Sequence, residues 1–155
     1  MQITNHKLKE ILVEPGHIDE ARFESAVKEA SKNKLPLERV LVENGLIKDE
    51  YLGKSIADAL DYHFIDLNKA KISEDLLALI PELVARNQQA IVFERTKDRI
   101  KLATASPDNY EFIKLLEKNT GLPIDAYYAT PLGIEEALRA YKSDLGIAVK
   151  SLIDD

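Results

Sequence analysis

Two pairs of adjacent carboxylates are the residues of this sequence whose type and spacing could carry acid–base chemistry. They are Asp19 with Glu20 and Asp49 with Glu50, and each pair directly precedes an apolar stripe of helical period. A carboxylate at that place can accept hydrogen bonds from the first free amides of a helix and faces the positive end of the helix dipole. The pairs therefore predict two helix starts rather than a catalytic site.

The other candidates for catalysis and metal binding also lack partners. Ser106-Pro107-Asp108 offers a possible nucleophile, but no histidine completes a constellation with it, so the serine is interpreted as a helix cap. The three histidines are scattered without metal-ligand spacing, and the absence of cysteine excludes disulfides, thiolate zinc sites and cysteine nucleophiles. We expect no catalytic residue, no metal ion and no cofactor.

The composition is typical of a soluble globular protein that does not bind nucleic acid. The net charge is -6 without a basic block, and aromatic content is 6% without tryptophan. The sequence therefore has few basic residues in one place to neutralise phosphates and few aromatic residues to stack on bases. The N-terminus shows no apolar signal segment, and no apolar run approaches the roughly 18 residues of a membrane helix. These features predict a cytoplasmic protein without direct membrane insertion.

The elements that would position these residues begin with a repeat. The pattern Leu-Val-Glu-x-Gly-x-Ile occurs at 12–18 and again at 41–47, and apolar residues around it also match. Gly16 and Gly45 are placed to end a helix in the left-handed conformation, and an apolar helical stripe follows each of them. The repeat therefore predicts four helices in two helix-turn-helix units.

The pattern changes after Leu60 into short strands and helices. Strands are expected at 63–67, 90–94, 99–104 and 124–129, with a hairpin turn at 95–98. Helices are expected at 74–79, from Pro81, from Ser106-Pro107 to Gly121, and from Thr130-Pro131 through Tyr141. The predicted fold class is α+β: a four-helix subdomain at 1–61, a small α/β subdomain with a three- or four-stranded sheet at 62–145, and a tail or linker at 146–155.

Four later segments complete an ordered set with the repeat. They are Phe64-Ile65-Asp66-Leu67, the run at 76–86, Ala105-Ser106-Pro107-Asp108 and Thr120-Gly121-Leu122. In this order the sequence, over roughly 6–142, resembles the amino-terminal (MshEN-type) domain of type II secretion and type IV pilus assembly ATPases. The motor of that family needs Gly-x-x-x-x-Gly-Lys-Ser/Thr, which this sequence lacks, so the resemblance implies a non-catalytic domain.

The resemblance implies two alternative functions. The first is docking to the cytoplasmic domain of an inner-membrane platform protein, which would hold the chain peripherally at the inner membrane. The alternative is a sensor, because some family members bind cyclic di-GMP through the paired units. The positions that correspond to such a site are Lys7, Leu8, Leu12, Leu37, Arg39 and Leu41.

This sequence departs from the family pattern where that ligand would be held. Arg-Leu-Gly is replaced by Lys7-Leu8-Lys9 in the first copy and by Pro36-Leu37-Glu38 in the second. Lysine is a point charge without the planar fork of arginine, and Glu38 would repel an anion. We therefore interpret the leucines and glycines as packing residues of the helix pairs, with cyclic di-GMP binding as the alternative. An unrelated enzyme has no catalytic constellation to support it.

Overall fold

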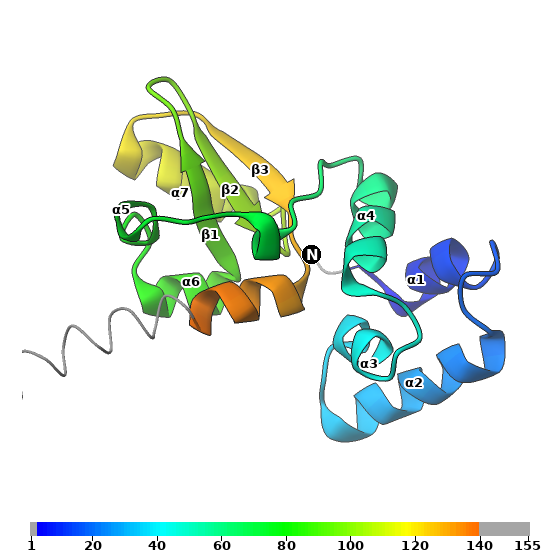
Figure 1. Cartoon of the computed structure of the whole chain (residues 1–155). Helices are drawn as coiled ribbons and strands as arrows, with labels where there is room; N and C mark the ends of the chain where they lie inside the picture. Colours follow the sequence, from blue (N-terminus) through cyan, green and yellow to red (C-terminus); the bar gives the residue numbers. More distant parts are fainter. Residues whose placement is uncertain (1–2, 140–155) are drawn as a thin grey trace, which may run out of the picture.

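The helices of the first lobe follow the repeat. The computed structural model describes residues 3–139 of the chain. The first copy forms α1 (Asn5–Leu12) and α2 (Glu20–Asn33), and the second forms α3 (Leu37–Glu43) and α4 (Asp49–Leu60) (Figure 1). The four predicted helices are confirmed. We call α1 to α4 the first lobe and the chain from residue 62 onward the second lobe.

The two copies end their first helices differently. Gly45 adopts the left-handed conformation (φ 74°) directly after the last residues of α3, as predicted. In the first copy, Pro15 takes the place of Asn44 and lacks the N–H that Asn44 donates into its helix. As a result, α1 already ends at Leu12, and Gly16 (φ 90°) lies in the turn beyond the helix instead of capping it.

A three-stranded sheet with the order β1-β2-β3 forms the centre of the second lobe. β1 (Ala90–Arg95) and β2 (Ile100–Thr104) form the predicted antiparallel hairpin, and β3 (Ile124–Tyr128) runs parallel to β2. The parallel connection is made by α7 (Tyr110–Thr120), which ends at Gly121 as predicted. The sheet has the smaller of the two expected strand numbers.

Short helices surround the sheet. α5 (Glu74–Leu77) and α6 (Glu82–Gln88) pack against β1, and α6 begins after Pro81 as expected. The last described helix covers 131–139, and its start is capped by the Thr130 hydroxyl, which accepts from the Gly133 amide at 3.0 Å. Tyr141 and the predicted tail at 146–155 lie outside the described residues.

The strand predicted at 63–67 is wrong. Only an isolated bridge joins Phe64 to Tyr128, and a 3₁₀ helix (Leu67–Lys69) follows at once. The Asp66 side chain starts that helix by accepting from the Asn68 amide at 3.0 Å. The apolar alternation of this segment favours a strand, but the aspartate cap ends the extended conformation after three residues.

The predicted start of α7 is also wrong. Ser106 does not cap the helix, because its carbonyl accepts from the Asn109 amide in a separate turn and its own amide donates to Thr104. Asn109 is the cap instead, accepting from the Phe112 amide at 3.4 Å. Pro107 is fully buried within the turn, so Ser106-Pro107 marks a turn and not a helix start.

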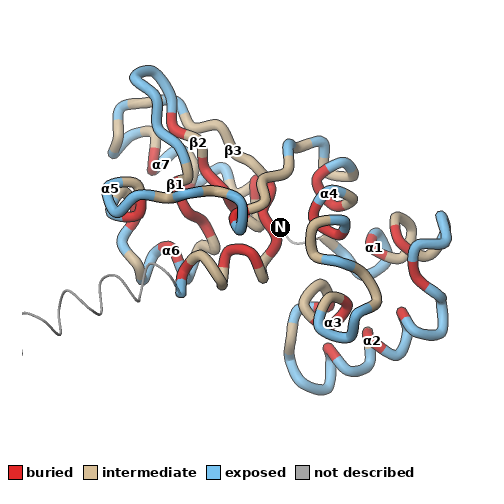
Figure 2. Tube along the Cα trace, in the orientation of Figure 1, coloured by how far each residue is buried: buried red, intermediate tan, exposed pale blue. Residues whose placement is uncertain are grey.

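Each lobe has its own apolar core (Figure 2). The first core contains the inward faces of α1 to α4, and the second contains the sheet with α5, α6, α7 and the helix at 131–139. Tyr128, at the end of β3, belongs to the core of the first lobe. The helical repeat thus buries one residue of the sheet, and this contact joins the two lobes.

Candidate functional site

The two copies of the repeat differ where the second lobe packs. Three exposed positions on one face of α2 correspond to partly or fully buried positions on α4. The positions are Glu20, Glu24 and Lys28 in α2, and Asp49, Gly53 and Ala57 in α4. Spacings of four residues keep each set on one helix face. On the face that meets the second lobe, α4 therefore carries two small uncharged residues, Gly53 and Ala57, where α2 carries Glu24 and Lys28.

Gly53 allows the closest of these contacts. A Cβ atom at this position would collide with the ring of Phe64, which leads toward the sheet. Gly53-Lys54-Ser55 matches the last residues of a phosphate-binding loop, but here it lies inside α4 and not in a loop between strand and helix. The glycine therefore serves helix packing.

Polar contacts cross the same boundary between the lobes. The Thr130 hydroxyl donates to Asp49 Oδ2 at 2.8 Å, Arg39 Nη1 lies 3.3 Å from Glu135 Oε2, and Lys69 lies 3.3 Å from Glu50. Burial raises the pKa of the Asp49 carboxyl, while the hydrogen bond from Thr130 opposes this shift. Asp49 Oδ1 is buried and meets no hydrogen-bond partner within residues 3–139.

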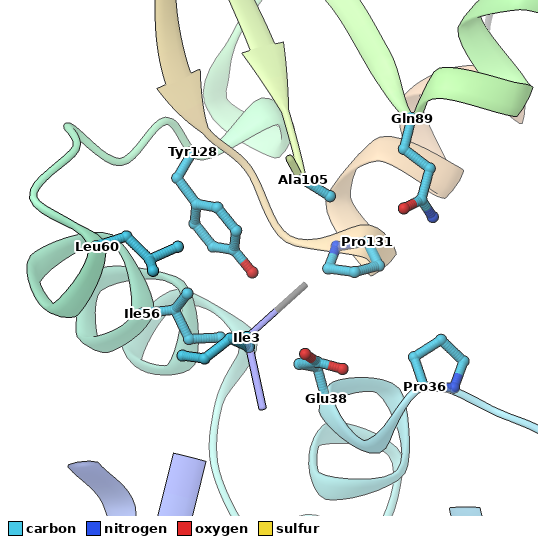
Figure 3. Close-up of a pocket in the computed structure, with 9 residues that line it drawn as sticks. All are labelled: Ile3, Pro36, Glu38, Ile56, Leu60, Gln89, Ala105, Tyr128 and Pro131. Carbon is cyan, nitrogen blue, oxygen red and sulfur yellow. The ribbon is translucent and has the colours of Figure 1, made fainter. Parts of the chain in front are cut away.

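A small cavity of about 40 Å³ lies between the lobes (Figure 3). The Glu38 carboxylate and the Tyr128 hydroxyl both point into it, from α3 and from the end of β3. Burial raises the pKa of Glu38, and burial together with the negative charge of Glu38 raises the pKa of Tyr128. A cavity of this size has room for water, and its buried carboxylate makes it unfavourable to an anion.

A larger open groove of about 570 Å³ adjoins α1. Lys7 lines it together with Tyr62, Asp108 and Tyr110 of the second lobe. A hydrogen bond with the Tyr110 hydroxyl, with burial as a second cause, raises the pKa of Tyr62 to about 12, so the Tyr62 phenol stays neutral. A cation beside two aromatic rings can hold a planar group that carries negative charge.

The structure separates the predicted ligand residues. Leu8, Leu12 and Leu41 have no exposed surface and Leu37 is 5% exposed, because all of them form the core of the first lobe. Arg39 pairs with Glu43 and Glu135 and does not line the groove. Of the predicted ligand positions, Lys7 alone lines this groove in the described part of the chain.

Sequence reasoning missed the tyrosines of the groove. Tyr62 follows α4 and Tyr110 begins α7, so the two residues are far apart in the sequence. No local spacing indicates that they meet, because their contact depends on how the second lobe packs on α4. The sequence offers only a tyrosine at the expected boundary between the lobes, Tyr62, and another inside an expected helix, Tyr110, which is too weak a signal to assign a site.

One negative finding concerns membranes. Among the helices within residues 3–139, none combines the length and the apolar character needed to cross a bilayer.

Comparison with known proteins supports one family. The family model of the MshEN domain matches residues 60–147. The type IV pilus assembly ATPase PilB of Myxococcus xanthus (strain DK1622) is 24% identical over 149 residues, which are 96% of this chain and 26% of that protein. PilB of Thermus thermophilus is 23% identical over 151 residues, or 96% of this chain and 17% of that protein. The chain thus spans about a quarter or less of the length of these relatives.

Solved structures share the fold. A structure of MshE with cdg is 25% identical, with a TM-score of 0.60 over 86% of this chain and 97% of that chain. A structure of the N-terminal domain of XpsE is 17% identical, with a TM-score of 0.59 over 90% of this chain and 96% of that chain. These similarities agree with the two-lobed α+β fold described above.

Proposed function

This chain belongs to the MshEN domain family, and we propose that it is the non-catalytic docking domain of a type II secretion or type IV pilus assembly ATPase. It would tether the motor to the cytoplasmic domain of an inner-membrane platform protein and so lie peripherally at that membrane. One observation carries the proposal. The matched relatives are pilus assembly ATPases of which this chain spans 26% or less, and its sequence holds no phosphate-binding loop.

An exposed apolar position on α6 supports a docking role. Leu83 is 71% exposed and Val84 beside it is 36% exposed, although the opposite side of the helix is buried through Ala85. Two adjacent apolar side chains exposed on one short helix form a small patch that a partner protein could cover. We therefore choose Leu83 as the first residue to test.

Calorimetric titration of the chain with the cytoplasmic domain of the platform protein tests the docking function. We expect saturable binding that Leu83→Asp weakens about tenfold or more, because a carboxylate would be buried at the interface. Leu115→Asp is the matched control, since Leu115 is 53% exposed on α7 and should leave binding unchanged. Absence of binding to the platform proteins of both secretion systems would refute the proposal.

A cyclic di-GMP sensor is the second candidate. The groove between Lys7 and the two tyrosines favours it, and so does the similarity to MshE, whose solved structure is described with cdg. Against it stand the buried leucines, the paired Arg39 and the Glu38 carboxylate beside the boundary of the lobes. Docking therefore remains the first proposal.

Titration with cyclic di-GMP, with ATP and GTP as controls, separates the two candidates. If the domain only docks to a partner protein, none of the three nucleotides should release or absorb heat of binding. Saturation by cyclic di-GMP alone would establish the sensor, and Lys7→Ala should then weaken binding about tenfold by removing a charge-assisted contact. Lys28→Ala, on the exposed face of α2, is the matched control.

A further inference from the structure

The outer edge of β3 is open over most of its length. Residues 63–65 meet this edge only at Tyr128, whose carbonyl accepts from the Ile65 amide at 3.0 Å and whose amide donates to the His63 carbonyl at 2.8 Å. Backbone groups alternate in direction along a strand, so Ile124 and Ala126 point the same way as Tyr128. No backbone hydrogen bond fills these two outward positions within residues 3–139.

The end of α4 explains why the pairing stops. Asp61 adopts the left-handed conformation (φ 62°), and the Tyr62 amide donates to the Ala57 carbonyl at 2.9 Å. These cap contacts hold the chain against α4 until residue 62. Only the short segment 63–65 therefore reaches β3, and the neighbouring place along the edge stays unfilled.

A groove of about 550 Å³ runs along the open edge. Its opposite wall is one face of α7, formed by Tyr110, Ile113 and Glu117. The chain turns back from α7 into β3 at Gly121, so Glu117 lies toward Ile124. A groove between a strand edge and a helix is the geometry in which extended peptides are bound by strand addition.

The charge of the groove selects the kind of peptide. No lysine or arginine is among its described lining residues. The carboxylate of Asp125 is matched by Arg99 through two bonds of 2.7 Å, which lower the pKa of Asp125. Glu117 forms no ion pair within residues 3–139, so a basic side chain is the complement of this groove.

The distance between Ile113 and Glu117 on α7 determines which residue pattern the bound peptide needs. Ile113 and Glu117 are separated by one helical turn, or about 6 Å along the axis. Alternate residues of a strand, which point to the same side, are about 6.7 Å apart. A strand in the groove can therefore place a basic side chain at Glu117 and an apolar one at Ile113 with one residue between them.

We propose that β3 and α7 bind an extended segment of a partner protein, which adds to the sheet as a fourth strand. The segment pairs its backbone with Ile124 and Ala126 and carries a lysine or arginine opposite Glu117. This site is separate from Leu83 on α6 and does not depend on which protein the domain docks to.

Nuclear magnetic resonance titration of the isotope-labelled chain tests the proposal. The probe is a blocked peptide of sequence Thr-Val-Thr-Lys-Thr-Val-Thr, whose symmetric pattern fits both strand directions, at up to about 1 mM. We expect amide shifts and slower hydrogen exchange at Ile124 and Ala126. A peptide with glutamate in place of lysine should bind at least about tenfold more weakly.

Two variants make the result specific. Glu117→Lys should reverse the preference between the two peptides, while Glu111→Lys, on an exposed part of α7, should leave it unchanged. Ala126→Pro removes an outward N–H without touching the ladder to β2 and should abolish binding; its melting temperature checks that the fold persists. Absence of shifts, equal binding of both peptides, shifts away from β3, or binding retained by Ala126→Pro would overturn the proposal. None of these outcomes bears on docking through Leu83.

Discussion

Glu38 and Asp49 are carboxylates that this chain keeps at the boundary between its lobes. Burial raises the pKa of both groups, and within the described residues neither forms an ion pair. Charged forms of such groups are unfavourable in the folded state. At the scale of the residue, the boundary therefore carries a cost in stability at neutral pH.

Replacing Glu38 should recover part of that cost. Because the folded-state pKa of Glu38 lies above its unfolded value, the free energy of unfolding falls as the pH rises through the window between them. Glu38→Gln removes this dependence and should be more stable than the parent at neutral pH, with the gain vanishing below a pH of about 4. Urea unfolding across this range measures the difference. Glu14→Gln, on an exposed glutamate, is the matched control for removing a carboxylate.

Gly53 is the residue where added bulk should be felt most. Gly53→Ala would push the Phe64 ring off α4, and because the ring is the movable end of a side chain we expect a loss of about 1–3 kcal/mol. Glu24→Ala, at the exposed equivalent position of α2, should change stability by about 0.5 kcal/mol or less. Equal effects of the two changes in urea unfolding would contradict the proposed packing role.

At the scale of the element, the two helix ends of the repeat offer a direct comparison. Asn44 donates its amide to the Val40 carbonyl at 3.0 Å, and Pro15 cannot make the equivalent bond to Ile11. The same apolar pattern thus yields helices with different ends because one residue lacks a donor.

Pro15→Asn should restore the missing turn of α1. We expect a new amide at position 15 that is protected from hydrogen exchange by the Ile11 carbonyl. The stability change should stay within about 1 kcal/mol, because the lost stiffness of proline in the unfolded chain opposes the gained bond. Free exchange of the new amide would show that the turn, and not the proline, ends the helix.

The sequence predicted those elements whose signals are local. Gly45 and the Asp19 cap placed helix ends of the repeat, whereas Gly16 did not, and the turn at 95–98 placed the hairpin. The errors arose where a competing local bond won: Asp66 ended the strand after Phe64, and Ser106 was drawn into a turn with Asn109. These competitions depend on hydrogen bonds that residue type alone does not rank.

The candidate site was predicted less well than the fold. Lys7 lines the groove, but the leucines expected beside it are core residues, since the pattern that places a ligand contact also places an apolar helix face. Tyr62 and Tyr110 meet only through the packing of the second lobe on α4. Contacts of this kind have no periodic trace in a single sequence.

At the scale of the whole molecule, the lobes are joined by a few specific contacts. Tyr128 is buried in the first core, Phe64 packs on Gly53, and Thr130 donates to Asp49. Each contact places a residue of the second lobe on the second copy of the repeat. The lobes should therefore unfold together rather than as independent units.

Thr130→Val tests this coupling. The change removes the hydroxyl that donates to Asp49 Oδ2, while Asp49 Oδ1 already lacks a hydrogen-bond partner among the described residues. We expect the free energy of unfolding to fall by about 1–3 kcal/mol at neutral pH. In the background of Asp49→Ala the same change should cost about 1 kcal/mol less, because the shared interaction is already gone. Additive losses in this double-mutant cycle would show that the hydrogen bond contributes nothing to joining the lobes.

The asymmetry between α2 and α4 also has a historical consequence. If the two helix pairs arose by duplication, they began with the same surface, and only the second became an internal one. Across related genomes, positions equivalent to Glu20, Glu24 and Lys28 should drift freely in charge, whereas those equivalent to Gly53 and Ala57 should stay small. The rate of substitution would then differ between two copies of one ancestral motif, and the slower copy would mark where the second lobe was acquired.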